Sequence, residues 1–371
     1  MNVGSHRPWL SRWLPAVLVS APVLAIGVLP AATAGALPTG YPIPVNVTLQ
    51  NGWESAAAVG SDPSGKPQVA VDGNGIVHLS GSIYNGSSDT EAFVLPSGDA
   101  PASDIWINTL DDGGVADDTY VYINTSGDVY PIGPEVTETT FLSGISFPAA
   151  SSPLGFSTLS LKNSWVSENS AYDSGNPAVA IDSEGIVHLS GSMAGGSYDT
   201  VAFVLPSADR PPAAIYVNTY TNEGTTGSLL IEKNGDVLPF GSDVATYTSL
   251  AGITFRSAQS ILAANKLTLQ NGWTGGGSST GNPTVTRDQY GFVHLAGSLT
   301  NSSDGGLVTV LPKADRPAND VFQTIYTYDG AIGYVVIYSD GGVYIAGQGS
   351  SYPLSSDEYS SFCSITFEAG V

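Results

Sequence analysis

The sequence predicts an all-β protein of three tandem β-sandwich or jelly-roll-like repeats that follow a signal peptide. One stretch of about a hundred residues occurs three times, which indicates a repeated domain. Within this stretch apolar residues alternate with polar ones, as they do in a half-buried strand. The 44 glycines and the many Ser, Thr and Asn residues are typical of short strands joined by turns.

Residues 1–36 differ in composition from the rest and predict a secretory signal peptide. Arg7 and Arg12 precede an uncharged apolar run, and the small residues at 32–36 fit a cleavage site. The apolar run is shorter than the roughly 20 residues of a membrane-spanning helix, and two prolines interrupt it. We therefore expect a secreted, extracellular protein with no membrane span after cleavage.

The repeat is clearest between Gly75–Ser97 and Gly185–Ser207, where 18 of 23 positions are identical. The third copy, from Gly291, has diverged but keeps the register, since in each copy a histidine stands 18 residues before a proline. The segments between copies are short, so neighbouring copies are expected to touch. The three repeats are expected at 45–150, 157–258 and 265–371.

About eight short strands are expected in each unit, separated by Gly- and Asn-rich turns such as Asp72–Gly75. In the first unit, Val77 and Leu79 share one face of a strand, whereas His78 and Ser80 share the other. No stretch beyond the signal segment has a helical period. The expected strands of the first unit cover residues 47–53, 68–72, 76–83, 91–95, 104–110, 119–124, 128–132 and 144–147.

The chain carries a net charge of −22, which disfavours nucleic acid and anionic membranes as partners because their phosphates are also negative. Such a surface suits an extracellular protein or one that attracts cations. Cys363 is the single cysteine, so no internal disulfide is possible. Because it lies in a predicted strand, we expect a packed thiol and not a nucleophile.

The order of short motifs along each unit resembles the C-terminal modules of phage tail-fibre and receptor-binding proteins. Similar modules occur in secreted proteins of Gram-positive bacteria. The resemblance covers nearly all of each unit. In the third unit it rests on Leu267 to Trp273, Gly291 to Ser298, Leu311-Pro312, Arg316-Pro317, Gly341-Gly342-Val343 and Ile365-Thr366-Phe367.

The resemblance implies β-sandwich heads that assemble as trimers and contact carbohydrate or protein at a cell surface. Since this chain carries three units covalently, we hypothesise a monomer that builds the pseudo-threefold cluster from one polypeptide. An extended string of units is the alternative. The first unit departs from the pattern, because Ala100 stands where the others have Arg210 and Arg316. Any role of that arginine is therefore absent there.

Three histidines, His78, His188 and His294, occupy the same strand position in the three units. If they converged on a pseudo-threefold axis they would form a Zn²⁺ site, because imidazole is a common ligand of that ion. Bonds of about 2 Å would require three separate units to meet very closely. We therefore favour a histidine packed on the polar strand face, hydrogen-bonded to a neighbour such as Ser80 or a backbone carbonyl, and we expect no metal or cofactor.

Trp53, Trp165 and Trp273 end equivalent segments of the three units. Their flat rings would suit stacking against a sugar. A tryptophan also buries a large area, and here each follows Asn-Gly or Asn-Ser, where a ring often covers the edge of a core. We interpret the three tryptophans as core residues.

Trp106 has Tyr216 and Phe322 as its counterparts, and this interchange of aromatic residues also favours a core position. Tyrosines in the variable stretches are better candidates for ligand contacts, because binding residues often lie on loops. These candidates are Tyr84, Tyr198, Tyr326 and Tyr328.

Four carboxylates, Asp111, Asp112, Asp117 and Asp118, lie in a Gly-rich loop of the first unit. Their spacing does not match an EF-hand loop, so we expect a solvated acidic loop and not a calcium site. The composition is compatible with the carboxylate pair of a glycoside hydrolase. No G-x-S-x-G elbow follows a strand, and no cysteine is available to pair with a histidine. We therefore expect no enzyme activity and assign no catalytic residue.

The preferred function is non-enzymatic recognition or adhesion, in which repeated β-sandwich modules bind a surface glycan or protein. Three copies of a weak site would add avidity. Two alternatives stay open: a structural envelope or matrix protein, and a secreted glycoside hydrolase that uses carboxylates.

Overall fold

The alternation of apolar and polar residues produces short antiparallel strands throughout the chain, and this confirms the all-β class. The computed structural model describes residues 40–59, 63–111, 119–241, 243–276, 280–300, 306–327, 332–347 and 360–370. The predicted signal peptide at 1–36 lies outside the described residues. No helix in the described part of the chain has the length and apolarity needed to cross a membrane.

The first unit forms three antiparallel sheets. The sheet β1-β3-β4-β11 consists of β1 (Val45–Asn46), β3 (Gln68–Val71), β4 (Ile76–Ser80) and β11 (Ser146–Pro148). The sheet β10-β5-β2 consists of β10 (Thr140–Phe141), β5 (Ser82–Tyr84) and β2 (Glu54–Ser55), which a 3₁₀ turn η2 (Ala56–Val59) follows. The sheet β6-β9-β8-β7 consists of β6 (Phe93–Val94), β9 (Asp128–Ile132), β8 (Tyr120–Ile123) and β7 (Ile105–Asn108).

The second unit repeats these sheets. The first is β12 (Ser157–Thr158), β14 (Ala178–Ile181), β15 (Ile186–Ser190) and β22 (Thr254–Arg256). The second is β13 (Val166–Ser167), β16 (Ser192–Ala194) and β21 (Thr248–Ser249). The third is β17 (Phe203–Val204), β20 (Asp236–Phe240), β19 (Thr226–Ile231) and β18 (Ile215–Tyr220). Two short helical turns are added, α1 (Asn169–Tyr172) and η3 (Asn222–Gly224).

The third unit has the same arrangement. Its first sheet is β23 (Asn265–Lys266), β25 (Thr284–Arg287), β26 (Phe292–Ala296) and β33 (Ile365–Glu368). Its second is β24 (Thr274–Gly275), β27 (Ser298–Thr300) and β32 (Ser360–Ser361). Its third is β28 (Thr309–Val310), β31 (Gly342–Gly347), β30 (Ile332–Ile337) and β29 (Val321–Tyr326), and a 3₁₀ turn η5 (Lys313–Asp315) precedes β29.

Two predicted strands of the first unit differ from the structure. The single strand expected at 76–83 is divided at Gly81, whose backbone has φ +82°, so β4 and β5 belong to different sheets. A side chain at Gly81 would overlap with the backbone of Lys66. The strand expected at 47–53 is absent from the sheets described, because Asn51 and Gly52 turn the chain with positive φ.

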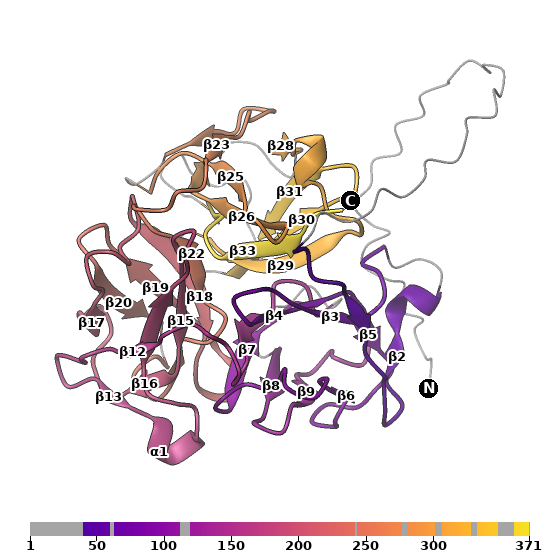
Figure 1. Ribbon diagram of the computed structural model, residues 1–371, viewed down its shortest axis with the longest axis horizontal. Coiled ribbons are helices and arrows are strands. Elements are labelled where there is room, and N and C mark those ends of the chain that lie inside the picture. Colours follow the sequence, from indigo (N-terminus) through magenta and orange to yellow (C-terminus); the bar gives the residue numbers. More distant parts are fainter. Residues whose placement is uncertain are drawn as a thin grey trace, which may run out of the picture.

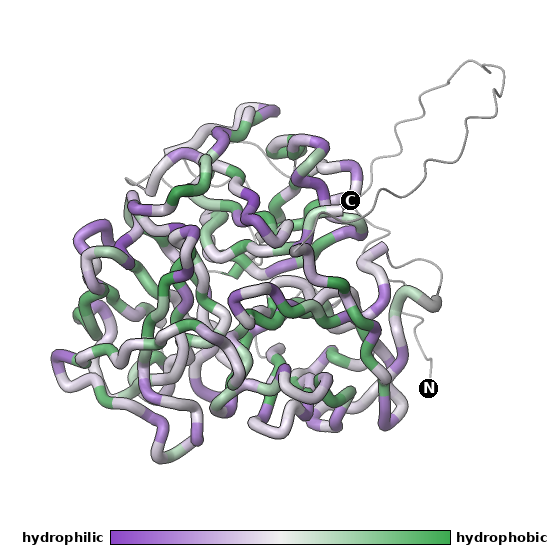
Figure 2. Tube along the Cα trace, in the orientation of Figure 1, coloured by the Kyte–Doolittle hydropathy of each residue, from purple (hydrophilic) through white to green (hydrophobic). Residues whose placement is uncertain are grey.

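Each unit encloses its own apolar core, and a tryptophan lies in each core as predicted. Trp53, Trp165 and Trp273 are 3, 3 and 4% exposed. A side chain at Gly86 would overlap with the Trp53 ring, which explains the glycine there. Along the chain trace, hydrophobic stretches concentrate in the strands of each unit (Figure 2). These tryptophans are therefore packing residues and not exposed sugar platforms.

The three units surround a common centre, and each contacts the other two (Figure 1). Loops at equivalent positions meet in a closed cycle. A Cβ atom at Gly175 of the second unit would lie 2.7 Å from Oγ of Ser103 of the first. One at Gly281 of the third unit would lie 3.4 Å from Ala213 of the second, and one at Gly65 of the first would lie 2.6 Å from Asn319 of the third. The third unit therefore closes back onto the first.

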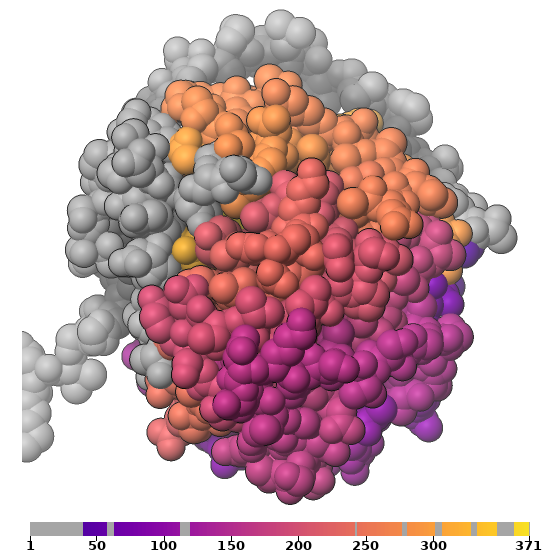
Figure 3. Space-filling model, turned by 90° about the vertical axis from the view of Figure 1, so that its left-hand side faces the viewer, coloured from indigo at the N-terminus to yellow at the C-terminus, as the bar shows by residue number. Residues whose placement is uncertain are grey.

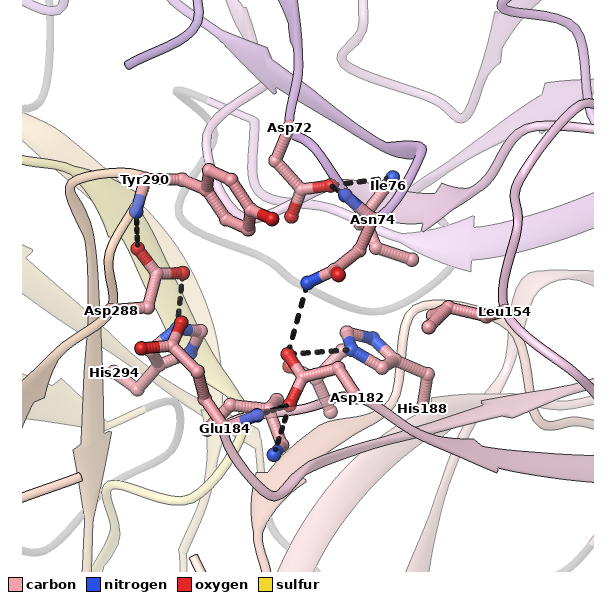
Figure 4. Close-up of polar contacts among 12 residues, drawn as sticks. Asp72, Asn74, Ile76, Leu154, Asp182, Glu184, His188, Asp288, Tyr290 and His294 are labelled. Carbon is pink, nitrogen blue, oxygen red and sulfur yellow. Dashed lines mark hydrogen bonds and ion pairs between the residues drawn. The ribbon is translucent and has the colours of Figure 1, made fainter. Parts of the chain in front are cut away.

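A second cycle of contacts lies where the turns before β4, β15 and β26 meet (Figure 4). Nδ2 of Asn74 donates to Oδ2 of Asp182 at 3.1 Å, which joins the first unit to the second. The backbone N–H of Gln289 donates to Oε2 of Glu184 at 3.1 Å, which joins the third unit to the second. Tyr290 of the third unit covers Gly73 of the first, where a side chain would meet its ring.

Candidate functional site

The outer face of the sheet β6-β9-β8-β7 carries a row of three aromatic side chains. Alternation along each strand buries Ile105, Val121 and Val129 and turns their neighbours outward. In the pairing register the outward residues are directly opposite one another. The row consists of Trp106 on β7, Tyr122 on β8 and Tyr130 on β9.

The rings of this aromatic row stack on one another across the strands. The centroids of Trp106 and Tyr122 are 4.9 Å apart with an interplanar angle of 26°. Those of Tyr122 and Tyr130 are 5.7 Å apart at 30°. All three side chains are half-buried, so each leaves part of its ring accessible. Cross-strand aromatic pairs of this kind also stabilise the sheet beneath them.

Two carboxylates flank the aromatic row. The Tyr122 hydroxyl donates to Oδ2 of Asp104 at 2.6 Å, and Oδ1 of Asp104 accepts the N–H of Thr125 at 3.0 Å. Asp128 accepts a hydrogen bond from Nδ2 of Asn124 at 2.9 Å. Burial and then the Asp104 carboxylate raise the pKa of Tyr122, and burial and then Asp128 raise the pKa of Tyr130. Both phenols therefore stay neutral, and the Tyr122 hydroxyl is oriented by its hydrogen bond to Asp104.

The second unit closes one end of the aromatic row. Trp106 meets Tyr247 edge-on at 5.7 Å and Tyr172 edge-on at 6.0 Å, and it lies parallel to Tyr220 at 6.5 Å. Tyr172 comes from α1 and is 41% exposed. The row therefore starts at the junction of the first two units and runs outward to Tyr130.

The other units lack an equivalent row. At the same register positions the second unit has Tyr216, Leu230 and Leu238. The third has Phe322, Val336 and Tyr344. The sheet and its pairing are repeated, whereas the continuous aromatic surface belongs to the first unit.

The predicted core position is confirmed for Phe322, which is 3% exposed in an apolar cluster shared with Phe141, whereas Trp106 and Tyr216 are only half-buried. Tyr216 stacks on Tyr326 at 4.8 Å across the junction of the second and third units. Phe322 stacks on Phe141 at 4.3 Å across the junction of the third and first. These aromatic residues lie at junctions between units, because the outward face of each third sheet contacts a neighbour.

The tyrosines proposed for ligand contacts have different environments. Tyr326 is 7% exposed at a junction, so it is not available for a ligand. The hydroxyl of Tyr84 donates to Glu54 at 2.9 Å. Tyr198 is 61% exposed and meets Phe240 edge-on, which leaves it accessible. Tyr328 lies outside the described residues.

The histidines lie on the polar strand face, as favoured from the sequence, and each faces the aspartate six residues before it. The Nε2 to Oδ2 distances are 3.6 Å for His78 and Asp72, 4.0 Å for the second pair and 3.2 Å for the third. This aspartate, and not Ser80, is the neighbour. The sequence contains the signal for this pairing, since an aspartate stands six residues before each of the three histidines. Figure 4 shows the second and third pairs, Asp182 with His188 and Asp288 with His294, together with Asp72 of the first unit around the junction of the turns.

The aspartates mainly hold the turns in shape. Oδ1 of Asp72 accepts the N–H groups of Asn74 and Ile76 at 2.8 and 2.9 Å. Burial raises the pKa of Asp182, but His188 and the equivalent backbone N–H groups outweigh it, so the net pKa is lowered. Within the described ranges, no three His, Cys, Asp or Glu side chains are grouped to hold a metal ion.

The structure also shows the environments of the single cysteine, of the acidic loop of the first unit and of the two arginines that the first unit lacks. Cys363 is buried, and burial raises the pKa of its thiol, as a packed cysteine requires. Asp111 is 1% exposed and accepts a 2.6 Å hydrogen bond from Thr119, so it is not part of a solvated loop. Asp112, Asp117 and Asp118 lie outside the described residues. Arg210 and Arg316 each donate from Nε to a backbone carbonyl at 3.1 Å, which braces a local loop.

The aromatic row is thus a continuous surface with apolar rings, neutral hydroxyl groups and carboxylate acceptors. Sequence reasoning missed it, because its three residues come from separate strands and only the pairing register brings them together. No protein-family model matches this chain, and no curated protein matches it.

Proposed function

We propose that this chain is an exported, non-enzymatic recognition protein that binds a neutral glycan on the first unit. The single observation that carries the proposal is the aromatic row of Trp106, Tyr122 and Tyr130. A glycan is the ligand class whose chemistry fits this surface best.

A sugar ring presents C–H groups together with hydroxyl groups. The C–H groups carry slight positive charge and favour the electron-rich aromatic surface. The hydroxyl groups find acceptors in Asp104 and Asp128 beside the row. The high negative charge of the chain disfavours an anionic ligand at this exposed face, so a neutral sugar is the better fit.

The second unit supplies the residues for a sharp test. We would replace Tyr122 and Tyr130 together by leucine, because Leu230 and Leu238 occupy the same positions there. Neutral oligosaccharides identified on a glycan array would then be measured by calorimetry. We expect the double variant to bind about tenfold more weakly or worse, since each stacked ring contributes roughly 1–3 kcal/mol in comparable aromatic stacking.

A matched control is Tyr198→Leu, which removes an exposed tyrosine of the second unit. It should leave binding unchanged, and both proteins should keep the thermal unfolding temperature within a few degrees of the wild type. Equal affinity of the double variant and the wild type would contradict the proposal. Failure of the wild type to bind any glycan on an array or any whole cell would also overturn the proposal, and would favour an envelope or matrix role.

A further inference from the structure

A cavity of about 360 Å³ lies where the second and third units meet. One wall is the polar face of β25, β26 and β33, which carries Thr286, His294 and Thr366. The opposite wall belongs to the second unit and includes Thr254 and Arg256. Figure 3 shows the second unit, in magenta to red, lying against the orange third unit. The volume falls in the usual range of small-molecule sites, roughly 300–1,000 Å³.

Thr286 lines this cavity, and its hydroxyl group, which is not fully buried, has no hydrogen-bond partner among the described residues. It is 3% exposed and lies directly opposite His294 in the strand register. The same register position is alanine in the other units, where Ala70 faces His78 and Ala180 faces His188. The fold therefore does not need a hydroxyl there, and the Thr286 hydroxyl is left available to a molecule in the cavity. A ligand hydroxyl in the cavity would supply the missing partner.

Arg256 is a cation without a carboxylate partner among the described residues, in a chain with 33 acidic and 11 basic side chains. Its Nη2 atom donates to the backbone carbonyls of Ser260 and Leu262 at 3.3 and 3.0 Å, which holds the guanidinium in place. Its Nε atom has no hydrogen-bond partner in the described structure. A positioned guanidinium with spare donors is suited to a carboxylate.

We propose that this cavity binds a single sugar acid of the uronic-acid class. Arg256 pairs with the carboxylate, and Thr286 hydrogen-bonds to a ring hydroxyl. Thr254 and Thr366 add further hydroxyl groups to the walls. His294 is positioned by Thr366 at 3.1 Å and Asp288 at 3.2 Å, so it shapes the cavity. The site is separate from the aromatic row and does not rest on the function proposed for it.

The junction of the third and first units contains a natural control. Its cavity of about 230 Å³ has Glu368 at the register position of Arg256 and Ala70 at that of Thr286. An acid replaces the base, and a methyl group replaces the hydroxyl. This second cavity should therefore reject an anion.

The test is titration of the full chain with glucuronate, glucose and acetate, followed by calorimetry and ligand-observed NMR. The wild type should bind glucuronate at least tenfold more tightly than glucose or acetate. Arg256→Gln should abolish that preference, and Thr286→Ala should weaken glucuronate binding several-fold. Glu368→Gln, in the other cavity, should leave glucuronate binding unchanged.

Conservative variants separate binding from folding. Thr286→Ser should restore glucuronate binding, and Arg256→Lys should keep part of the preference for the carboxylate. The proposal fails if the wild type does not distinguish glucuronate from glucose. It also fails if Thr286→Ala and Arg256→Gln bind glucuronate like the wild type, or if inorganic phosphate binds and glucuronate does not.

Discussion

Two junctions of the ring, between the second and third units and between the third and first, are built from the same strands of the repeat. In each, the closing strand of one unit faces the central strands of the next. At one register position on the closing strand, the first of these junctions has Arg256 and the second has Glu368. The repeated backbone therefore determines how the units contact one another, whereas single side chains determine which ligand charge each cavity can bind.

The difference in charge has a consequence for stability. Burial raises the pKa of Glu368 to about 7, because the carboxylate is removed from water without a compensating cation. Arg256 has backbone carbonyls as partners. The junction of the third and first units is therefore the one whose stability should depend on pH between the acidic and neutral range.

The largest effect is expected when that junction is blocked sterically. Gly144 has φ +88°, and a Cβ atom there would overlap with the Gln323 side chain of the third unit. Gln323 is buried and donates to the carbonyl of Thr366 at 3.0 Å, so its displacement breaks that bond. We expect Gly144→Ala to lower the free energy of unfolding by about 2–4 kcal/mol, measured by chemical denaturation.

The equivalent glycine at the junction of the first and second units provides the control. Gly252 has φ +79°, but the nearest atom to a Cβ there is Cδ1 of Ile107 at 3.1 Å. Gly252→Ala should cost about 1–2 kcal/mol, mostly from backbone strain. Equal losses in the two variants would show that the Gln323 contact does not distinguish the junctions.

A smaller effect is expected from Glu368→Gln, and its sign depends on pH. Since the pKa of Glu368 is about 7 in the folded state against an ordinary 4.5, the folded state binds more protons between these values. The free energy of unfolding therefore falls as pH rises through this window. The glutamine variant should unfold at a higher temperature than the wild type at pH 8 and at a similar temperature below the ordinary pKa.

Thermal unfolding at pH 8 and pH 4 would measure this, with the exposed Glu138→Gln as the matched control. The control should unfold at the same temperature as the wild type at both pH values. If Glu368→Gln did so too, the acid would not oppose formation of the junction, and the contrast with Arg256 would lose its electrostatic basis.

The smallest effect is expected from Phe292→Ile. Phe292 stacks on His78 with centroids 3.6 Å apart and an interplanar angle of 18°, and it is 1% exposed. Ile76 and Ile186 occupy the same strand position in the other units. We expect the isoleucine variant to lose about 1–2 kcal/mol from the stack and the buried volume. Unchanged denaturation would indicate that this ring does not strengthen the junction.

Much of the strand pattern was predictable because it depends on neighbours in sequence. Alternation placed His78 on the polar face and Val77 in the core, as the structure has them. The two errors in the predicted strands of the first unit also have local causes. The chain leaves the sheet at Gly81, and it turns at Asn51, where positive φ ends the extended conformation.

The candidate site was less predictable. Trp106, Tyr122 and Tyr130 each occupy an ordinary alternating position, and nothing local marks them as neighbours. Their adjacency follows from two strand registers, which depend on the turns and on the packing of the sheet. The cavity residues Thr286 and Arg256 belong to different units, so only contact between units brings them together.

By itself, the sequence determined the all-β class and the polar or apolar side of each strand, because alternation and turn residues act over a few bonds. The tertiary structure alone decided the aromatic row, the closed cycle of unit contacts and the charged cavities. These features depend on close approach between segments far apart in the chain. That approach is set by the summed packing of whole sheets and not by any local pattern.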